Sequence, residues 1–122
     1  MLKQLLIGAV MISLTVGVHA TFMALGVALL RRWAGKRPRY RTAEATVAVS
    51  AFVLVMFGAA IVEIWAWSAL FLFADAFGAV ETAVYFTTVT YTTLGYGDIT
   101  LEAPIRQLAA ICAANGILMF GW

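Results

Sequence analysis

Apolar residues form three long stretches along the chain. Residues 5–30 contain no Lys, Arg, Asp or Glu, residues 45–73 contain Glu63 as their one charged residue, and a third stretch covers residues 104–122. A helix needs about 20 apolar residues to cross a hydrocarbon core about 30 Å thick. The pattern therefore predicts three membrane-spanning helices, and Pro104 suits the first turn of the third.

The interval between the second and third stretches, residues 74–103, is too polar to span a bilayer and too apolar to be a free loop. Irregular backbone at membrane depth is tolerated only where it is buried in protein or lines a water-filled cavity. We therefore expect a re-entrant segment that contains a short helix over residues 79–92. Glu81 falls in its first turn, where an acid suits the positive end of the helix dipole, and Asp75 is either a cap or a solvated turn residue.

Composition agrees with a membrane location. Hydrophobic residues make up 64% of the chain and charged residues 11%, and the mean hydropathy is +0.97. A soluble domain of 122 residues with this composition would leave large apolar patches in water. Cys112 is the one cysteine, which excludes an intrachain disulfide and predicts a small buried side chain.

Positive charge is concentrated between the first two stretches. Of the eight Lys and Arg residues, six lie within residues 31–41: Arg31, Arg32, Lys36, Arg37, Arg39 and Arg41. Because cytoplasmic loops carry an excess of Lys and Arg, this interval indicates topology and not nucleic-acid binding. The protein is then a multi-pass protein of the cell (plasma) membrane with its N-terminus outside and its C-terminus in the cytoplasm. With Trp33 and Tyr40 interleaved, the interval is also a candidate for binding anionic lipids.

A cleavable signal peptide is the alternative interpretation of the first stretch, because Lys3 precedes an apolar run and Val18-His19-Ala20 fits a small-residue cleavage site. However, the apolar run continues to Leu30 before it meets the basic interval. Cleavage would leave an apolar stub too short to span, so a complete spanning helix is favoured.

Two glycines separated by one residue give the most informative local pattern. An L-residue needs about 1–2 kcal/mol to enter left-handed backbone space, which glycine enters almost freely. Gly95 and Gly97 are therefore expected to take left-handed conformations while Leu94 and Tyr96 take the others. Neighbouring peptide planes then point their carbonyl oxygens the same way, and Thr93 adds a hydroxyl at the inner end.

The sequence TLGYGD at residues 93–98, which follows an apolar, threonine-rich segment, resembles the signature sequence of potassium channels. The resemblance covers residues 45–122 and implies an all-α pore domain of outer helix, pore helix, selectivity filter and inner helix, while residues 1–44 add a helix and a basic loop. It also implies a homotetramer that conducts K⁺ passively, with K⁺ as the transported ion and no cofactor or small-molecule substrate. The oxygens implied to bind the ion belong to Thr93, Leu94, Gly95, Tyr96 and Gly97.

The resemblance also identifies residues that support the filter. In the family, the acid at the position of Asp98 hydrogen-bonds to a residue early in the pore helix, and Tyr85 occupies that position here. Tyr85 and Phe86 replace an aromatic pair that carries indole donors in many relatives, and Val89 replaces a pore-helix carboxylate of some members. We expect the filter to be held differently, with the oxygens that face the ion unchanged. A weakly selective cation channel, or a non-conducting membrane subunit that retains the filter as a structural core, are the alternatives.

Four further side chains and one glycine are candidates for particular functions. Gly116 is either a hinge or a site of close helix packing. Glu63 is either a proton-sensitive group or a carboxyl hydrogen-bonded between helices. At 1.5 Å per residue, Glu63 lies about 15 Å and His19 about 21 Å from the outer side, so a pair between them is conceivable. Trp65 and Trp67 are expected at the membrane interface.

Other functions find little support. No second carboxylate is placed to work with Glu63, and no nucleophile with a base or phosphate-binding loop is present in the sequence, so an enzyme is not expected. The first two apolar stretches also lack the spaced basic residues of a voltage sensor.

Overall fold

The structure, a computed structural model, describes residues 1–34 and 42–122. These two ranges contain four helices and no strand. The helices are α1 (Leu2–Ala34), α2 (Thr42–Phe73), α3 (Val80–Tyr91) and α4 (Arg106–Gly121). Lys36, Arg37, Arg39, Tyr40 and Arg41 lie outside the described residues, so the lipid-binding hypothesis for them stays a prediction.

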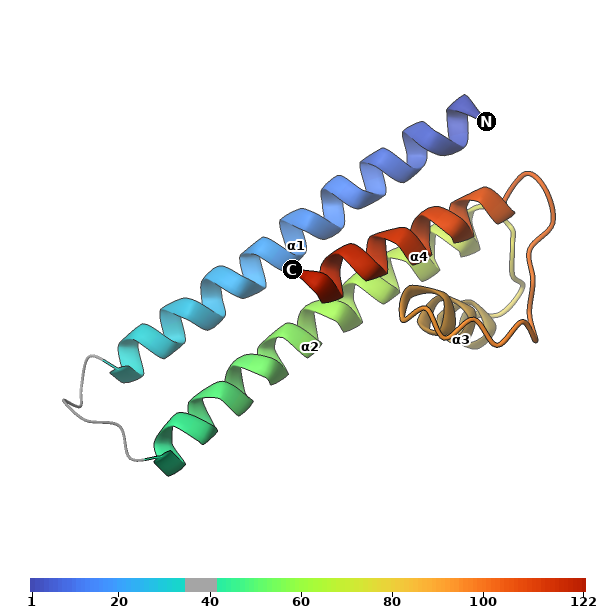
Figure 1. Cartoon of the computed structure of the whole chain (residues 1–122). Helices are drawn as coiled ribbons and strands as arrows, with labels where there is room; N and C mark the ends of the chain where they lie inside the picture. The colour runs from blue at the N-terminus through green and yellow to red at the C-terminus, as the bar shows by residue number, and fades with distance from the viewer. Residues whose placement is uncertain (35–41) are drawn as a thin grey trace.

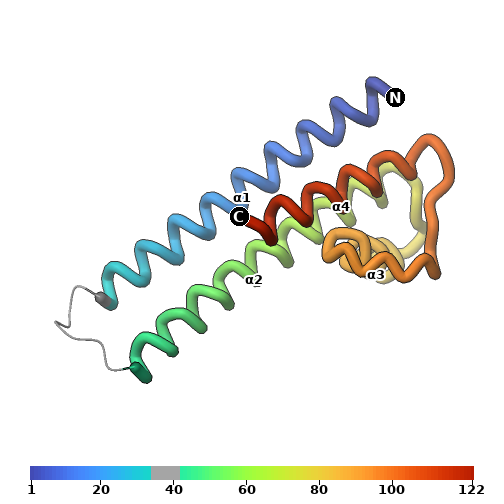
Figure 2. Tube along the Cα trace, viewed as in Figure 1, coloured from blue at the N-terminus to red at the C-terminus, as the bar shows by residue number. Residues whose placement is uncertain are grey.

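The helices α1 and α2 run antiparallel to one another over their whole length (Figure 1). The helix α4 runs in the same direction as α1, beside its N-terminal half, and contacts α1 and α3. The short α3 packs against α2 and α4 near the end of α2, and the long loop after α3 returns the chain to the start of α4 (Figure 2). The N-terminus and the loop after α3 therefore lie toward one end of the molecule.

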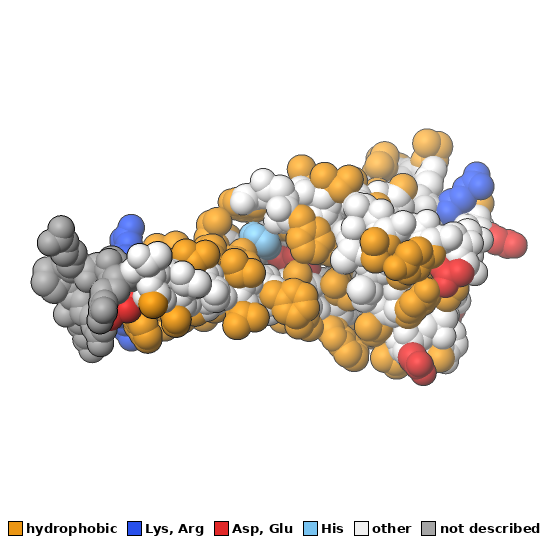
Figure 3. Space-filling model, turned by 60° about the horizontal axis from the view of Figure 1, so that its bottom comes forward, with side chains coloured by type: hydrophobic (Ala, Val, Ile, Leu, Met, Phe, Trp, Pro, Cys, Tyr) orange, Lys and Arg blue, Asp and Glu red, His pale blue; other side chains and the backbone are white. Residues whose placement is uncertain are grey.

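Two helices within the described residues are long and apolar enough to cross a membrane, Leu2–Trp33 and Thr42–Phe73, each 32 residues long. Only 22% and 11% of their most apolar windows are buried in the chain, which argues against the core helices of a soluble domain. Apolar side chains accordingly cover much of the surface (Figure 3). The helix α4 has 16 residues, about 24 Å at 1.5 Å per residue, so a third span stays a prediction.

The re-entrant helix begins and ends within one residue of its predicted bounds. Its N-cap is Ala79 and its C-cap is Thr92, and Glu81 lies in its first turn as predicted. The prediction for Pro104 was wrong, because α4 begins at Arg106 with Ile105 as its N-cap. Pro104 lies in the preceding turn, after a cis Ala103–Pro104 peptide bond.

Asp75 ends α2 in a left-handed conformation, with φ of +53°. Its N–H donates to the carbonyl of Leu72 at 3.0 Å, and the N–H of Ala76 donates to the carbonyl of Phe71 at 3.0 Å. These two bonds form a Schellman motif, which satisfies carbonyls that the helix end would leave unpaired. Asp75 is thus a cap residue whose side chain is also exposed to solvent.

Aromatic side chains attach α3 to α2. The ring of Phe86 lies 5.4 Å from that of Phe71 and 5.1 Å from that of Phe77, and Phe71 also contacts Trp67 at 6.1 Å. Trp67 is fully buried, so its predicted place at the membrane interface was wrong, whereas Trp65 is 53% exposed. The two tryptophans differ because residues two apart on a helix point about 200° apart around its axis.

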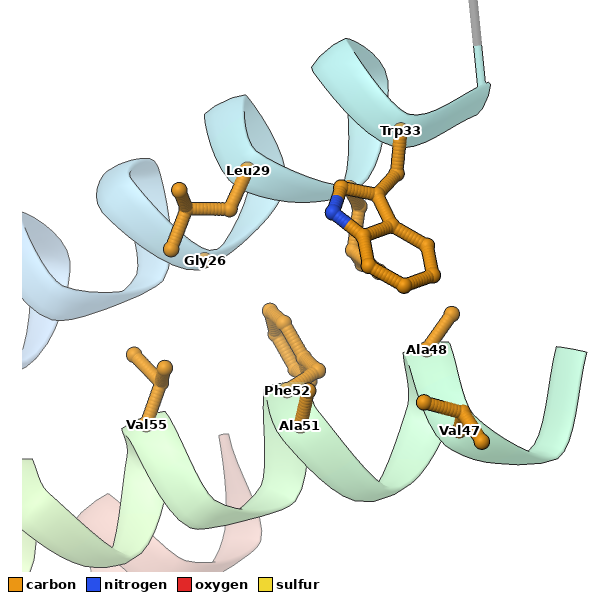
Figure 4. A pocket seen from close by; sticks show the side chains of 9 residues that line it. Gly26, Leu29, Trp33, Val47, Ala48, Ala51, Phe52 and Val55 are labelled. Carbon is orange, nitrogen blue, oxygen red and sulfur yellow. The ribbon is translucent and has the colours of Figure 1, made fainter. Parts of the chain in front are cut away.

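The end of the α1–α2 pair that is remote from α3 contains a cavity of about 180 Å³, between the last turns of α1 and the first turns of α2 (Figure 4). Its walls are apolar and include Leu29, Trp33 and Val55. A Cβ at Gly26 would lie 2.8 Å from the ring of Phe52, so glycine is what allows α1 to approach α2 here.

Candidate functional site

The segment after α3 alternates in backbone handedness. Thr93, Gly95 and Gly97 have φ of +62°, +55° and +74°, whereas Leu94 and Tyr96 do not enter the left-handed region. The prediction for the two glycines is confirmed. Thr93 was missed, because a β-branched residue rarely takes positive φ and nothing local in the sequence favours it. This alternation is what aligns successive peptide planes instead of opposing them as in a strand.

Backbone hydrogen bonds tie the inner end of this segment to α3. The N–H groups of Thr92 and Thr93 donate to the carbonyls of Thr88 and Thr90, each at 3.0 Å, and the N–H of Gly95 donates to the carbonyl of Val89 at 3.2 Å. Val89 therefore contacts residues 93–98, the predicted filter segment, through its main chain, although its side chain cannot replace a carboxylate. The negative end of the α3 dipole lies at the same place, which favours a cation there.

A side-chain hydrogen bond ties the outer end of the segment to α3. The hydroxyl of Tyr85 donates to Oδ2 of Asp98 at 2.6 Å, the contact that the resemblance implied. This hydrogen bond raises the pKa of the Tyr85 hydroxyl above its ordinary value. Phe86 is buried in the aromatic contacts with α2 and leaves Tyr85 as the polar member of the pair.

Residues 93–98 are exposed in the single chain, with Leu94 57% and Tyr96 66% exposed. Apart from Asp98, no side-chain hydrogen bond of these six residues is recorded within the described part of the chain. One chain thus presents one strand of oxygens, and enclosing a dehydrated ion would need further strands from other copies.

A buried cluster lies beside this segment. Glu63 of α2 is fully buried, and its Oε1 lies 3.0 Å from Nδ1 of His19 on α1, while its Oε2 accepts a hydrogen bond from the hydroxyl of Tyr91 at 2.8 Å. The pair between His19 and Glu63, which their depths made conceivable, is confirmed. Tyr91 was missed, because its distance from Glu63 depends on how α3 docks against α2. The His19 ring also stacks on Trp122 at 5.5 Å, so His19 is a helix-contact residue.

Gly116 lies where α4 crosses the end of α3. A Cβ at this position would overlap the carbonyl oxygen of Tyr91, so the structure supports the close-packing interpretation. Its role as a hinge stays a prediction. A second polar contact, also missed, joins α4 to α1: Nδ2 of Asn115 donates to the hydroxyl of Thr15 at 2.8 Å, and both side chains are fully buried. Cys112 is a buried free cysteine, as predicted.

Residues 1–34 and 42–122 contain no group of three or more His, Cys, Asp or Glu side chains arranged to hold a resident metal ion.

Comparison with known proteins agrees with this geometry. A family model described as an ion channel matches residues 45–122, which include α3, the filter segment, α4 and nearly all of α2. No curated protein and no solved structure matches the chain. The matched region covers more than half of the 122 residues, and α1 lies outside it. The chain is a membrane protein that belongs to the ion-channel family, with a two-helix ion-channel domain of the potassium-channel type.

Proposed function

We propose that the chain forms a potassium-selective channel that conducts K⁺ passively across a membrane. The observation that carries the proposal is the alternation of left-handed residues at Thr93, Gly95 and Gly97, between anchors at both ends. A backbone of this kind offers several carbonyl oxygens on one side over a short distance. Hard monovalent cations are bound by oxygens of this type, and a stack of them replaces the hydration shell of K⁺.

Four copies around one axis would complete the site. Each copy contributes the carbonyl oxygens of Thr93, Leu94, Gly95 and Tyr96, and Thr93 adds its hydroxyl at the inner end. Closed rotational symmetry is the usual arrangement of identical subunits, and the exposure of residues 93–98 in one chain leaves these groups free to meet at the axis. The four α3 dipoles would point their negative ends at the entering cation.

The proposed topology has three spanning helices in the cell membrane, with α4 as the third. Arg31 and Arg32 lie in the last turn of α1, at the end remote from the filter segment. Because cytoplasmic ends are rich in Lys and Arg, these residues support a cytoplasmic location for that end and an outer location for the filter. The apolar cavity beside these two arginines suits an acyl chain whose anionic headgroup pairs with their guanidinium groups.

Reconstitution in liposomes tests the proposal. The purified chain is placed in vesicles with and without anionic phospholipid, and K⁺ and Na⁺ fluxes are measured separately. We expect K⁺ flux to exceed Na⁺ flux at least tenfold, and to rise with anionic lipid. Equal fluxes would favour the weakly selective cation channel. An assembled protein without any flux would favour the non-conducting subunit.

A further inference from the structure

Tyr91, the last residue of α3, is the point where α2 and α4 meet this helix. Its side chain is fully buried, and its hydroxyl donates to Oε2 of Glu63 on α2 at 2.8 Å. Its ring lies 5.9 Å from that of Phe120 on α4, and its carbonyl oxygen faces Gly116 on the same helix. The residue is thus fixed at its hydroxyl, its ring and its carbonyl.

Glu63 is in turn fixed by two partners. One carboxyl oxygen of Glu63 accepts a hydrogen bond from the Tyr91 hydroxyl, and the other lies 3.0 Å from Nδ1 of His19. A single buried side chain therefore connects α1 to the end of α3. A buried carboxyl is costly unless its hydrogen bonds are made, and removing one partner leaves that cost uncompensated. The positions of His19 and Tyr91 are therefore tied to one another.

The hydrogen bond between Glu63 and Tyr91 is important because the backbone of Thr93, two residues after Tyr91, is strained. Thr93 has φ of +62°, which a β-branched residue adopts only where its surroundings over-determine it. On one side the segment is held by Tyr91, and on the other by the N–H of Gly95, which donates to the carbonyl of Val89 at 3.2 Å. If Tyr91 were free to shift, Thr93 could return to a relaxed conformation and turn its oxygens away.

We propose that the Glu63 carboxylate is a positioning group for the filter: it holds Tyr91 in place, and Tyr91 keeps Thr93 in the left-handed conformation that presents the inner oxygens to K⁺. The second oxygen of Glu63 is hydrogen-bonded to His19 of α1. The helix α1 therefore contributes to the positioning of the filter, although α1 lies outside the residues that the family model matches. The inference rests on the proposed potassium conduction.

Two variants remove the hydrogen bond from opposite sides, and one retains it. Tyr91→Phe deletes the donor and keeps the ring, while Glu63→Leu deletes the acceptor. Glu63→Gln keeps an acceptor for Tyr91 and places an amide opposite His19. In liposomes we expect Tyr91→Phe and Glu63→Leu to lower K⁺ flux about tenfold or more, with a lower K⁺/Na⁺ flux ratio, and Glu63→Gln to keep the wild-type ratio.

The matched control is Thr15→Val, which breaks an equally buried polar contact, between α1 and α4, without touching Glu63 or Tyr91. We expect it to lower the melting temperature of the assembled protein and to keep the wild-type flux ratio. If Tyr91→Phe or Glu63→Leu assembles and keeps that ratio, or Thr15→Val loses it equally, the inference is overturned. If only one of Tyr91→Phe and Glu63→Leu assembles, the K⁺/Na⁺ flux ratio of that variant tests the inference. A wild-type chain without K⁺ flux would instead refute the proposed function.

Discussion

Gly95→Ala tests the backbone argument most directly. Gly95 has φ of +55°, and a Cβ added there would meet no atom of the chain within 4 Å. Within one chain the substitution is therefore a change of conformational preference and not a steric clash. We expect alanine to pull residue 95 out of the left-handed region, so that its carbonyl no longer points with those of its neighbours.

The size of the effect follows from the backbone preference and the symmetry. An L-residue is less stable in left-handed space by about 1–2 kcal/mol. If all four strands must be left-handed at once, the conducting arrangement becomes less favourable by about 4–8 kcal/mol. Since about 1.4 kcal/mol corresponds to a factor of ten, its population falls by roughly 10³ to 10⁶.

Potassium flux in liposomes measures this loss, and Gly17→Ala is the matched control. Gly17 lies within α1 with no atom within 4 Å of its added Cβ and no left-handed φ, so alanine there should favour the helix by about 1 kcal/mol. We expect Gly95→Ala to abolish measurable flux while Gly17→Ala keeps it. Wild-type flux in Gly95→Ala, or equal loss in both variants, would refute the reasoning.

Three further substitutions probe other parts of the site. Tyr85→Phe removes the hydrogen bond to Asp98 and should speed the loss of current under sustained opening, measured by planar-bilayer recording. Gly116→Ala introduces a Cβ that overlaps the Tyr91 carbonyl oxygen and should destabilise the assembled protein by about 1–3 kcal/mol, measured by thermal melting in detergent. Glu63→Gln removes the buried acid and, under the proton-sensing hypothesis, should flatten the pH response of K⁺ flux in liposomes.

Each of these has a clear contrary result. Unchanged kinetics in Tyr85→Phe would argue against a role for that contact in filter stability. A melting temperature equal to that of the wild type in Gly116→Ala would mean that α4 does not approach α3 as closely as the structure shows. A pH response that survives in Glu63→Gln would remove the proton-sensing hypothesis for this residue.

Some features of the fold depend on residues nearby in the chain, and others depend on how the helices pack. The bounds of α3 were predicted to within one residue at each end, because they depend on polarity and turn residues nearby in the chain. Pro104 and Trp67 were misplaced. The helix α4 begins two residues after Pro104, and Trp67 is fully buried because of the way the helices pack around α2.

The sequence by itself determined the apolar segments and the left-handed glycines at 95 and 97, because hydropathy and the absence of a Cβ act residue by residue. Only the tertiary structure decided that Thr93 is left-handed and that Glu63 joins His19 to Tyr91. These features depend on the rotation of each helix about its axis and on the distance between helices. No local pattern in the chain encodes either quantity.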